Sequence, residues 1–347
     1  MSEASETETG PGLPAASTPG SGSVRKHRSV AEQAMRVGSR YGVVVLVLVL
    51  AITFSITNND IFPTERNLQS VFGSNSILML TALGSMVPLI VGEFDLSVGN
   101  MLGLGTVVTA ILPGEHGFGL IPVFLITIGI GALAGLINGI LITKVGISSF
   151  IATLGTGTVI SGIALYLSGG RVLFVGIPQS LEGFSQGFWL QIPILTVVAG
   201  CFALLLWYAT EHTPVGRRLY AVGLGRDAAR LSGVRPDRFL IGAFVFSASM
   251  AALSGFLEVG RVGSGGPLIG PEFLLPALAA CFLGATTIRP GRFNVLGTVV
   301  AVTVVAIGIN GLALNGAPDW LIPVFNGAVL LAAVGLSRFA SKRVRTT

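Results

Sequence analysis

The sequence predicts an all-α polytopic membrane protein with about ten transmembrane helices. Three observations predict this fold class. Hydrophobic residues make up 51% of the 347 residues and charged residues only 11%, whereas about 25% of a soluble domain is charged. Apolar runs long enough to cross a bilayer recur along the chain, and the mean hydropathy is +0.80. Lysine and arginine are confined to particular segments between these runs.

This composition excludes a soluble enzyme, a disordered chain and a nucleic-acid-binding domain. Cys201 and Cys281 lie in apolar runs and the three histidines lie far apart, so we expect no disulfide framework and no metal site. The sequence motifs of nucleotide-binding loops, zinc proteases and serine hydrolases are absent. We therefore expect no cofactor and no catalytic residue. The energy for any transport must come from a partner or from an ion gradient.

The N-terminal segment is too polar to bury a core. Residues 1–23 contain mainly Ser, Thr, Gly, Pro and Glu and are predicted to be disordered. Residues 24–40 carry five basic residues directly before the first apolar run, and no cleavage site for a secretory signal follows that run. The chain therefore divides into a cytoplasmic tail (1–40), a transmembrane domain (41–337) and a basic cytoplasmic tail (338–347).

Ten apolar segments approach the length of about 20 residues that a transmembrane helix needs. In chain order they are 41–57, 74–92, 96–112, 120–143, 149–168, 190–210, 239–257, 273–288, 294–314 and 320–337. The third and eighth segments are the least regular, because they are short and either rich in glycine or interrupted by Pro276.

The distribution of basic residues tests this count. With ten helices and a cytoplasmic N-terminus, cytoplasmic segments hold 18 of the 21 lysines and arginines, and external segments hold only Arg66, Arg171 and Arg261. Such an asymmetry satisfies the positive-inside rule. It predicts a multi-pass protein with both termini in the cytoplasm.

Glycines recur at intervals of four residues within two of the predicted helices. Gly131, Gly135 and Gly139 form one such series, and Gly99 and Gly103 form another. Small residues on one face of a helix allow close approach of a neighbouring backbone in lipid. We therefore expect a compact bundle.

The longest cytoplasmic segment, residues 211–238, holds six arginines. Within it, residues 227–233 predict a short helix, because an acidic residue lies in the first turn and strong helix formers follow. Gly233 can end this helix in the left-handed conformation. Such a helix suits docking of a cytoplasmic partner, although a solvated loop whose arginines only set the topology would have the same composition.

Four motifs occur in order along the membrane portion. They are Tyr220-Ala-Val-Gly223-Leu-Gly-Arg-Asp227-Ala-Ala-Arg230-Leu-Ser-Gly233-Val, Glu93-Phe-Asp95-Leu-Ser97-Val-Gly99, Gly135-Leu-Ile-Asn138-Gly139 and Phe150-Ile-Ala-Thr153-Leu-Gly155-Thr. Together they resemble ABC-importer permeases of the ribose, xylose, arabinose and galactoside type, over about residues 41–337.

The resemblance implies the permease subunit of a bacterial ABC importer. In that family the first motif forms the coupling helix that contacts the ATPase, which assigns this contact to Arg226, Asp227, Ala228, Ala229, Arg230, Leu231, Ser232 and Gly233. The implied partners are a cytoplasmic ATPase, an extracytoplasmic solute-binding protein and a second permease copy, in the lipid of the bacterial inner membrane. The implied substrate is a monosaccharide or polyol, and the sequence does not determine which one.

The chain departs from the family pattern at three places. Glu93 stands where the family usually has glycine, and Asp227 stands where glutamate is common. The turn after the eighth helix contains Arg289 and Arg292, where many relatives have a stretch rich in glycine and serine. The sequence leaves the roles of Glu93 and of this arginine turn open.

Four polar residues are candidates for the substrate pathway: Asp95, Ser97, Asn138 and Asn310. Asp95 precedes a helix, where a carboxylate either caps the exposed N–H groups or lines the translocation route. Asn138 and Asn310 lie in the middle of apolar runs, where an amide either joins two helices or contacts a sugar hydroxyl. No lysine or arginine lies at the centre of a predicted helix, which favours a neutral solute over an anionic one.

The two halves of the membrane domain have similar patterns. Each half places an acidic turn before its second helix, at Asp95 and Glu272, and an Asn-Gly pair in its third helix. Helices 2–5 and 7–10 would have opposite orientations, so this pattern predicts an inverted repeat, a common transporter plan.

Two alternatives of function remain, an ion-coupled secondary transporter and an ABC permease for a non-sugar solute. The first would need a buried ionisable residue at mid-membrane, and none of the predicted helix centres has one. A membrane-embedded enzyme is a further alternative, and it would need a catalytic cluster that Asp95 alone does not form.

Overall fold

The computed structural model describes residues 30–345, with side chains from residue 41 to residue 335. The expectations for residues 1–29 and for the last two residues lie outside this range. The elements are α1 (Val30–Thr57), α2 (Glu65–Ile90), α3 (Val98–His116), α4 (Leu120–Ile140), a π-helical turn η1 (Leu141–Val145), α5 (Ser149–Ser168), α6 (Gln179–Ser185), β1 (Phe188–Trp189), β2 (Ile192–Pro193), α7 (Ile194–His212), α8 (Pro214–Leu224), α9 (Arg226–Leu231), α10 (Pro236–Val262), a 3₁₀ turn η2 (Gly270–Phe273), α11 (Leu274–Gly284), α12 (Val295–Leu314) and α13 (Leu321–Arg345).

Each of the ten predicted spans is occupied by a helix. Within the described residues, six helices are long and apolar enough to cross a membrane, namely α2, α4 with η1, α5, α7, α10 and α12. The apolar stretches in α1, in η2 with α11, and in α13 are shorter. The structure therefore confirms an all-α polytopic membrane protein, and it does not by itself confirm ten spans.

Several helix boundaries differ from the sequence prediction, and two of the differences have a clear physical reason. Helix α2 begins at Glu65 instead of residue 74, because its polar first turn is capped: Thr64 Oγ1 accepts a hydrogen bond from the Asn67 amide at 3.3 Å. Counting apolar residues cannot detect a polar first turn. The predicted helix 273–288 ends already at Gly284. Its Pro276 is tolerated because it lies in the first turn, where its missing N–H would have no helical partner.

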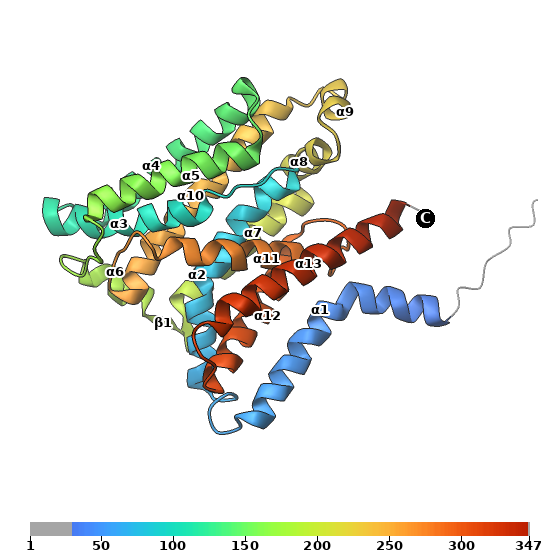
Figure 1. Ribbon diagram of the computed structural model, residues 1–347, viewed down its shortest axis with the longest axis horizontal. Coiled ribbons are helices and arrows are strands. Elements are labelled where there is room, and N and C mark those ends of the chain that lie inside the picture. The colour runs from blue at the N-terminus through green and yellow to red at the C-terminus, as the bar shows by residue number, and fades with distance from the viewer. Residues whose placement is uncertain (1–29, 346–347) are drawn as a thin grey trace, which may run out of the picture.

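Helix α10 lies at the centre of the bundle and packs against α2, α3 and α4. Helix α3 also packs against α5, while α2 packs against α7, α11 and α12, and α11 packs against α12 and α13. In Figure 1, α3, α4 and α5 form a group on the upper left, and α1, α12 and α13 form a second group on the lower right. Helices α2 and α10 thus join two groups of helices.

The predicted glycine faces lie at close helix contacts. A Cβ atom at Gly131 would lie 2.7 Å from the Ala248 carbonyl oxygen, and one at Gly139 would lie 2.8 Å from the Ile241 Cα, both on α10. A Cβ at Gly103 would lie 2.7 Å from the Pro267 carbonyl oxygen, in the segment before η2. A methyl group at these positions would push the backbones apart, so the prediction of a compact bundle is confirmed.

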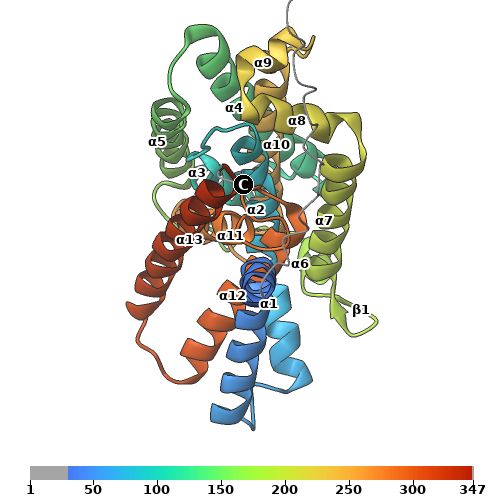
Figure 2. The ribbon, with the colours of Figure 1, turned by 90° about the vertical axis from the view of Figure 1, so that its right-hand side faces the viewer.

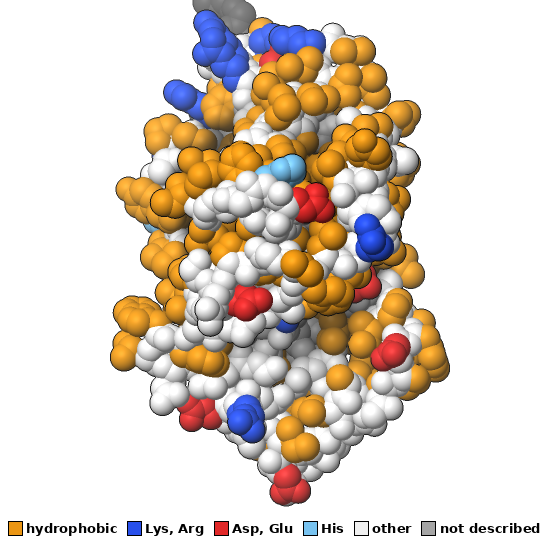
Figure 3. All heavy atoms as spheres, turned by 90° about the vertical axis from the view of Figure 1, so that its left-hand side faces the viewer, with side chains coloured by type: hydrophobic (Ala, Val, Ile, Leu, Met, Phe, Trp, Pro, Cys, Tyr) orange, Lys and Arg blue, Asp and Glu red, His pale blue; other side chains and the backbone are white. Residues whose placement is uncertain are grey.

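The ends of the bundle differ in character. Figure 2 shows α8 and α9 together at one end and the hairpin β1–β2 toward the other. On the face shown in Figure 3, hydrophobic side chains are widespread with acidic and basic side chains scattered among them, and a group of lysine and arginine side chains lies at the upper end.

Candidate functional site

The segment that is predicted to be cytoplasmic and to dock a partner folds as two short helices. Thr213 caps α8 by accepting a hydrogen bond from the Val215 amide at 3.2 Å, and Pro214 occupies the first helical position. Helix α9 then ends in a Schellman motif, in which the Val234 amide donates to the Ala229 carbonyl at 3.0 Å. Gly233 has a φ of 79°, so the prediction that it ends the helix in the left-handed conformation is confirmed.

Helix α9 presents almost all of its surface to its surroundings. Of the eight residues assigned to ATPase contact, Ala229 is buried and the other seven are exposed. Leu231 is 91% exposed, as is Leu224 directly before the helix. These two leucines are the exposed apolar part of the surface formed by α8 and α9.

Three of the four predicted pathway residues meet in a buried hydrogen-bond network. Asp95 Oδ1 accepts from the Ser97 amide at 3.0 Å and from Ser97 Oγ at 2.6 Å, directly before α3. Asn138 Nδ2 on α4 donates to Ser97 Oγ at 3.0 Å, and Thr156 Oγ1 on α5 donates to Asn138 Oδ1 at 2.6 Å. The network therefore ties the start of α3 to α4 and α5.

The same network has one incomplete position. Asp95 Oδ2 is buried beside Ser247 of α10 and makes no hydrogen bond of ordinary length. Oδ1 bonds to Ser97, the residue directly before α3, and α3 has no side-chain cap hydrogen bond, so a capping role of Asp95 stays a prediction. The contacts of Asn138 fit the interpretation as a link between helices. A role of these residues in the substrate pathway stays a prediction.

Asn310, the fourth pathway candidate, lies in a different place. Its side-chain amide forms a reciprocal pair with that of Asn67, with distances of 3.2 and 3.1 Å. This pair joins α12 to α2, and it does not connect with the network around Asn138.

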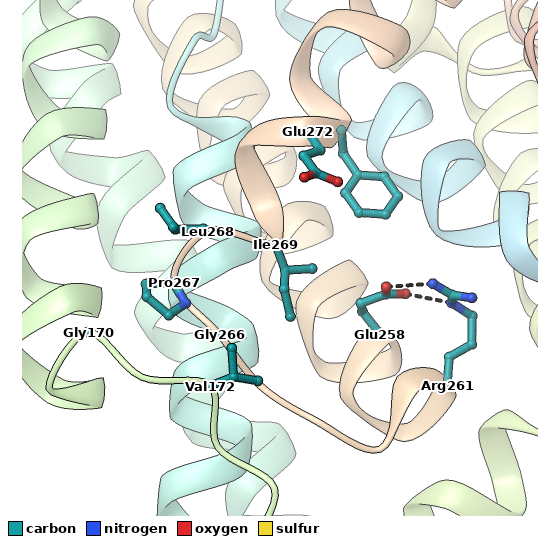
Figure 4. Close-up of a pocket in the computed structure, with 10 residues that line it drawn as sticks. Gly170, Val172, Glu258, Arg261, Gly266, Pro267, Leu268, Ile269 and Glu272 are labelled. Carbon is teal, nitrogen blue, oxygen red and sulfur yellow. Dashed lines mark hydrogen bonds and ion pairs between the residues drawn. The ribbon is translucent and has the colours of Figure 1, made fainter. Parts of the chain in front are cut away.

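A cavity of about 320 Å³, which no sequence pattern had indicated, lies at the C-terminal end of α10, the end that the predicted topology places outside. It is lined by Gly170, Val172, Glu258, Arg261, Gly266, Pro267, Leu268, Ile269, Glu272 and Phe273. Both carboxylate oxygens of Glu258 accept hydrogen bonds from the Arg261 guanidinium at 2.7 Å. In Figure 4, this ion pair lies at the lower right, Glu272 lies above it, and Gly266 to Ile269 form the left wall. We call this space the outer cavity.

The backbone of one wall of the outer cavity is held by hydrogen bonds to neighbouring segments. Thr106 Oγ1 of α3 donates to the Gly266 carbonyl at 2.9 Å and accepts from the Gly266 amide at 3.1 Å. Leu173 and Gly265 exchange two backbone hydrogen bonds at 2.7 and 2.9 Å. Polar groups of the cavity are therefore held on a rigid frame. The i,i+3 spacing of Glu258 and Arg261 within an apolar run was the signal that could have revealed the ion pair.

In comparisons with known proteins, this chain is similar to permease components of transport systems. The family model described as "Branched-chain amino acid transport system / permease component" matches residues 67–334. The ribose import permease protein RbsC of Bacillus subtilis (strain 168) is 34% identical over 306 residues, which cover 87% of this chain and 92% of that protein. No solved structure has a significant match to the chain.

Two further relatives transport other solutes according to their names. The D-allose transport system permease protein AlsC of Escherichia coli (strain K12) is 29% identical over 87% of this chain and 93% of its own. The galactose/methyl galactoside import permease protein MglC of the same strain is 29% identical over 87% of this chain and 96% of its own. The chain therefore belongs to the family described as the permease component of the branched-chain amino acid transport system.

Proposed function

We propose that this protein is the membrane-spanning subunit of an ATP-driven importer, and that it translocates a monosaccharide or a similar polyol. The observation that carries this proposal is the match over nearly the full length of the chain to permeases named for ribose, D-allose and galactose. The chain contains no nucleotide-binding motif, so a cytoplasmic ABC ATPase hydrolyses the ATP. A solute-binding protein delivers the substrate from outside, and a second copy of the chain completes the pathway.

Helix α9 is the docking element for the ATPase in this proposal. Its exposed residues include three charged ones, Arg226, Asp227 and Arg230, and the apolar Leu231, and together they form a small surface. A partner that covers Leu224 and Leu231 would remove two fully exposed leucines from water. Closure of the ATPase around ATP would then displace α8 and α9 relative to the bundle.

In the membrane, the proposed arrangement has ten spans, cytoplasmic termini and an inverted repeat of helices 2–5 and 7–10. The packing supports the repeat. If α2 corresponds to α10, then α3, α4 and α5 correspond to α11, α12 and α13. Helix α10 contacts α3 and α4, and α3 contacts α5. The corresponding pairs in the other half are α2–α11, α2–α12 and α11–α13, and these helices are also in contact. The 18-to-3 distribution of basic residues supports the orientation.

The outer cavity is the proposed entry site for the substrate. Its volume of about 320 Å³ is in the range of small-molecule sites. Glu272 and the Glu258–Arg261 pair supply hydrogen-bonding groups, and Phe273 supplies an aromatic surface. Arg261 is the one cation among the described residues that line the cavity, and its charge is compensated by Glu258. A neutral polyhydroxy solute fits this lining better than an anion does.

A branched-chain amino acid is the second candidate substrate, because the description of the matching family names that class. An amino acid carries a carboxylate that would need a free cationic partner. In the outer cavity the Arg261 guanidinium already donates to both oxygens of Glu258. This occupied guanidinium favours the sugar.

Co-purification with the ATPase tests the proposal. The tagged protein is solubilised from membranes that also contain its ATPase, and we expect both chains in the purified complex. Leu231→Asp in α9 is expected to abolish co-purification, whereas Leu190→Asp, an equally apolar and 78% exposed position at the hairpin, is expected to preserve it. Solute uptake driven by an ion gradient without any ATPase would contradict the proposal.

A further inference from the structure

The first residue of α9 is joined to the turn between α2 and α3. The Arg226 guanidinium donates to the Glu93 carboxylate. The Glu93 side chain is only 15% exposed, so this ion pair is partly shielded from water. Gly223 at the end of α8 approaches the same region so closely that a Cβ there would collide with the Ile90 carbonyl oxygen. The α2–α3 turn is therefore in direct contact with both coupling helices.

The turn between α11 and α12 is joined to α7 and α8 in a similar way. The Tyr220 hydroxyl on α8 donates to the Phe293 carbonyl at 2.7 Å, and the Arg292 guanidinium lies 3.4 Å from the centre of the Tyr220 ring. Burial raises the pKa of the Tyr220 hydroxyl above its ordinary value, so it remains a hydrogen-bond donor at physiological pH. Arg289 donates to Glu211 at the end of α7.

Three phenylalanines connect the two turns directly. Phe94, next to Glu93, stacks on Phe282 of α11 with ring centres 6.0 Å apart. Phe282 in turn meets Phe293 edge to face, with centres 5.4 Å apart. The contacts therefore form a closed ring. It runs from Arg226 of α9 to Glu93, through Phe94, Phe282 and Phe293, and back to Tyr220 of α8. We call these contacts the coupling ring.

Each turn in the coupling ring leads into a different half of the bundle. The α2–α3 turn continues through Asp95 and Ser97 into the network that holds α3, α4 and α5 together. The α11–α12 turn ends at Asn294, which caps α12 by accepting from the Gly297 amide at 2.7 Å. A displacement of α8 and α9 would thus reach both halves through short, stiff connections.

We propose that Glu93 and Arg226, together with Tyr220 and Arg292, are positioning residues that transmit the movement of α8 and α9 to both halves of the membrane domain. The proposal rests on the function proposed above. It gives a role to Glu93 and to the arginine turn, two of the three places where the chain departs from the pattern of the family it resembles.

Charge inversion tests the first connection. The complex with ATPase and binding protein is reconstituted in liposomes, and the number of sugar molecules imported per ATP hydrolysed is measured. Glu93→Arg is expected to lower this ratio about fivefold or more, the usual minimum for coupling between two sites, while the ATPase still co-purifies. The double variant Glu93→Arg with Arg226→Glu is expected to restore the ratio, because the pair forms again with reversed polarity.

A matched control is the ion pair between Lys144 and Asp237. It is also exposed and predicted to be cytoplasmic, with an N–O distance of 2.7 Å, but it joins η1 to α10. Because Asp237 also lies within the electrostatic influence of Arg226 and Arg230, the control changes Lys144 alone. Lys144→Glu breaks this pair by charge inversion and is expected to leave the ratio unchanged. The second connection is tested by Tyr220→Leu, which is expected to lower the ratio as Glu93→Arg does.

The outcomes separate this proposal from the proposed function. If the wild-type complex does not import sugar at the expense of ATP, the proposed function fails. If the wild-type complex does so and Glu93→Arg retains the wild-type ratio, the role of the coupling ring is overturned. A double variant that co-purifies with the ATPase but does not recover the ratio also overturns it, since only a direct contact between Glu93 and Arg226 predicts recovery.

Discussion

Asn67 on α2 and Asn310 on α12 form a reciprocal pair of amide hydrogen bonds, although 243 positions separate them in the sequence. Each side chain is at once donor and acceptor for the other. Asn67 is buried, so loss of one partner leaves polar atoms of the other without a hydrogen bond. The pair is therefore a specific link between the two halves of the bundle.

This link predicts a particular pattern of stability. Asn310→Leu is expected to destabilise the purified protein by about 1–3 kcal/mol, because Asn67 Oδ1 loses its hydrogen-bond donor, although Asn67 Nδ2 still donates to the Phe62 carbonyl at 3.0 Å. The double variant Asn67→Leu with Asn310→Leu is expected to be more stable than the sum of the single changes. The stabilities of the wild type, the two single variants and the double variant are measured by thermal unfolding in detergent. Strictly additive effects would mean that the two amides do not interact.

Gly233 provides a test of the end of α9. Gly233→Val places a β-branched side chain at a φ of 79°, which is strained by about 1–3 kcal/mol. We expect loss of ATPase coupling and of uptake with the membrane domain still folded. Gly316→Val is the control, because Gly316 also has a positive φ, of 71°, and open space around it, but lies between α12 and α13. Normal uptake by Gly233→Val would contradict the assignment of α9.

The topology is tested by labelling introduced cysteines. In a background without Cys201 and Cys281, a cysteine in place of Ser180 is expected to react with an impermeant thiol reagent added outside intact cells. A cysteine in place of Ser232 is expected to react only after the membrane is opened. Both side chains are exposed, so a difference in labelling reports the side of the membrane. Labelling of the Ser232 position from outside would refute the predicted orientation.

The outer cavity predicts a role for Glu272. Glu272→Gln keeps the shape of the side chain and weakens its hydrogen bonds to sugar hydroxyls. We expect the sugar concentration at half-maximal uptake to rise about fivefold, as loss of about 1 kcal/mol of hydrogen bonding implies. Glu115→Gln is the control, since Glu115 is an exposed carboxylate at the end of α3 that does not line the cavity. Equal behaviour of the two variants would exclude the cavity as the entry site.

The sequence predicted the helix positions because apolar length is a local property. It also predicted the left-handed Gly233 and the close contacts of Gly131 and Gly139, since glycine spacing and helix-ending signals are local too. The start of α2 at Glu65 was missed, because a capped polar turn has no apolar signal.

Contacts between distant segments were not predictable from one sequence. The partner of Asn310 lies on α2, and the partner of Glu93 lies on α9, so neither pairing is visible in the local pattern. The outer cavity was missed for a related reason. Its polar groups come from α10 and from the segment before α11, which only the fold brings together.

Transport by the reconstituted complex is the most direct test of the central claim. Liposomes containing this protein and its ATPase receive the solute-binding protein outside and ATP inside, and uptake of labelled ribose, allose, galactose and leucine is measured side by side. We expect ATP-dependent accumulation of a neutral monosaccharide and none of leucine. Accumulation of leucine alone, or sugar uptake that continues when ATP is withheld, would contradict it.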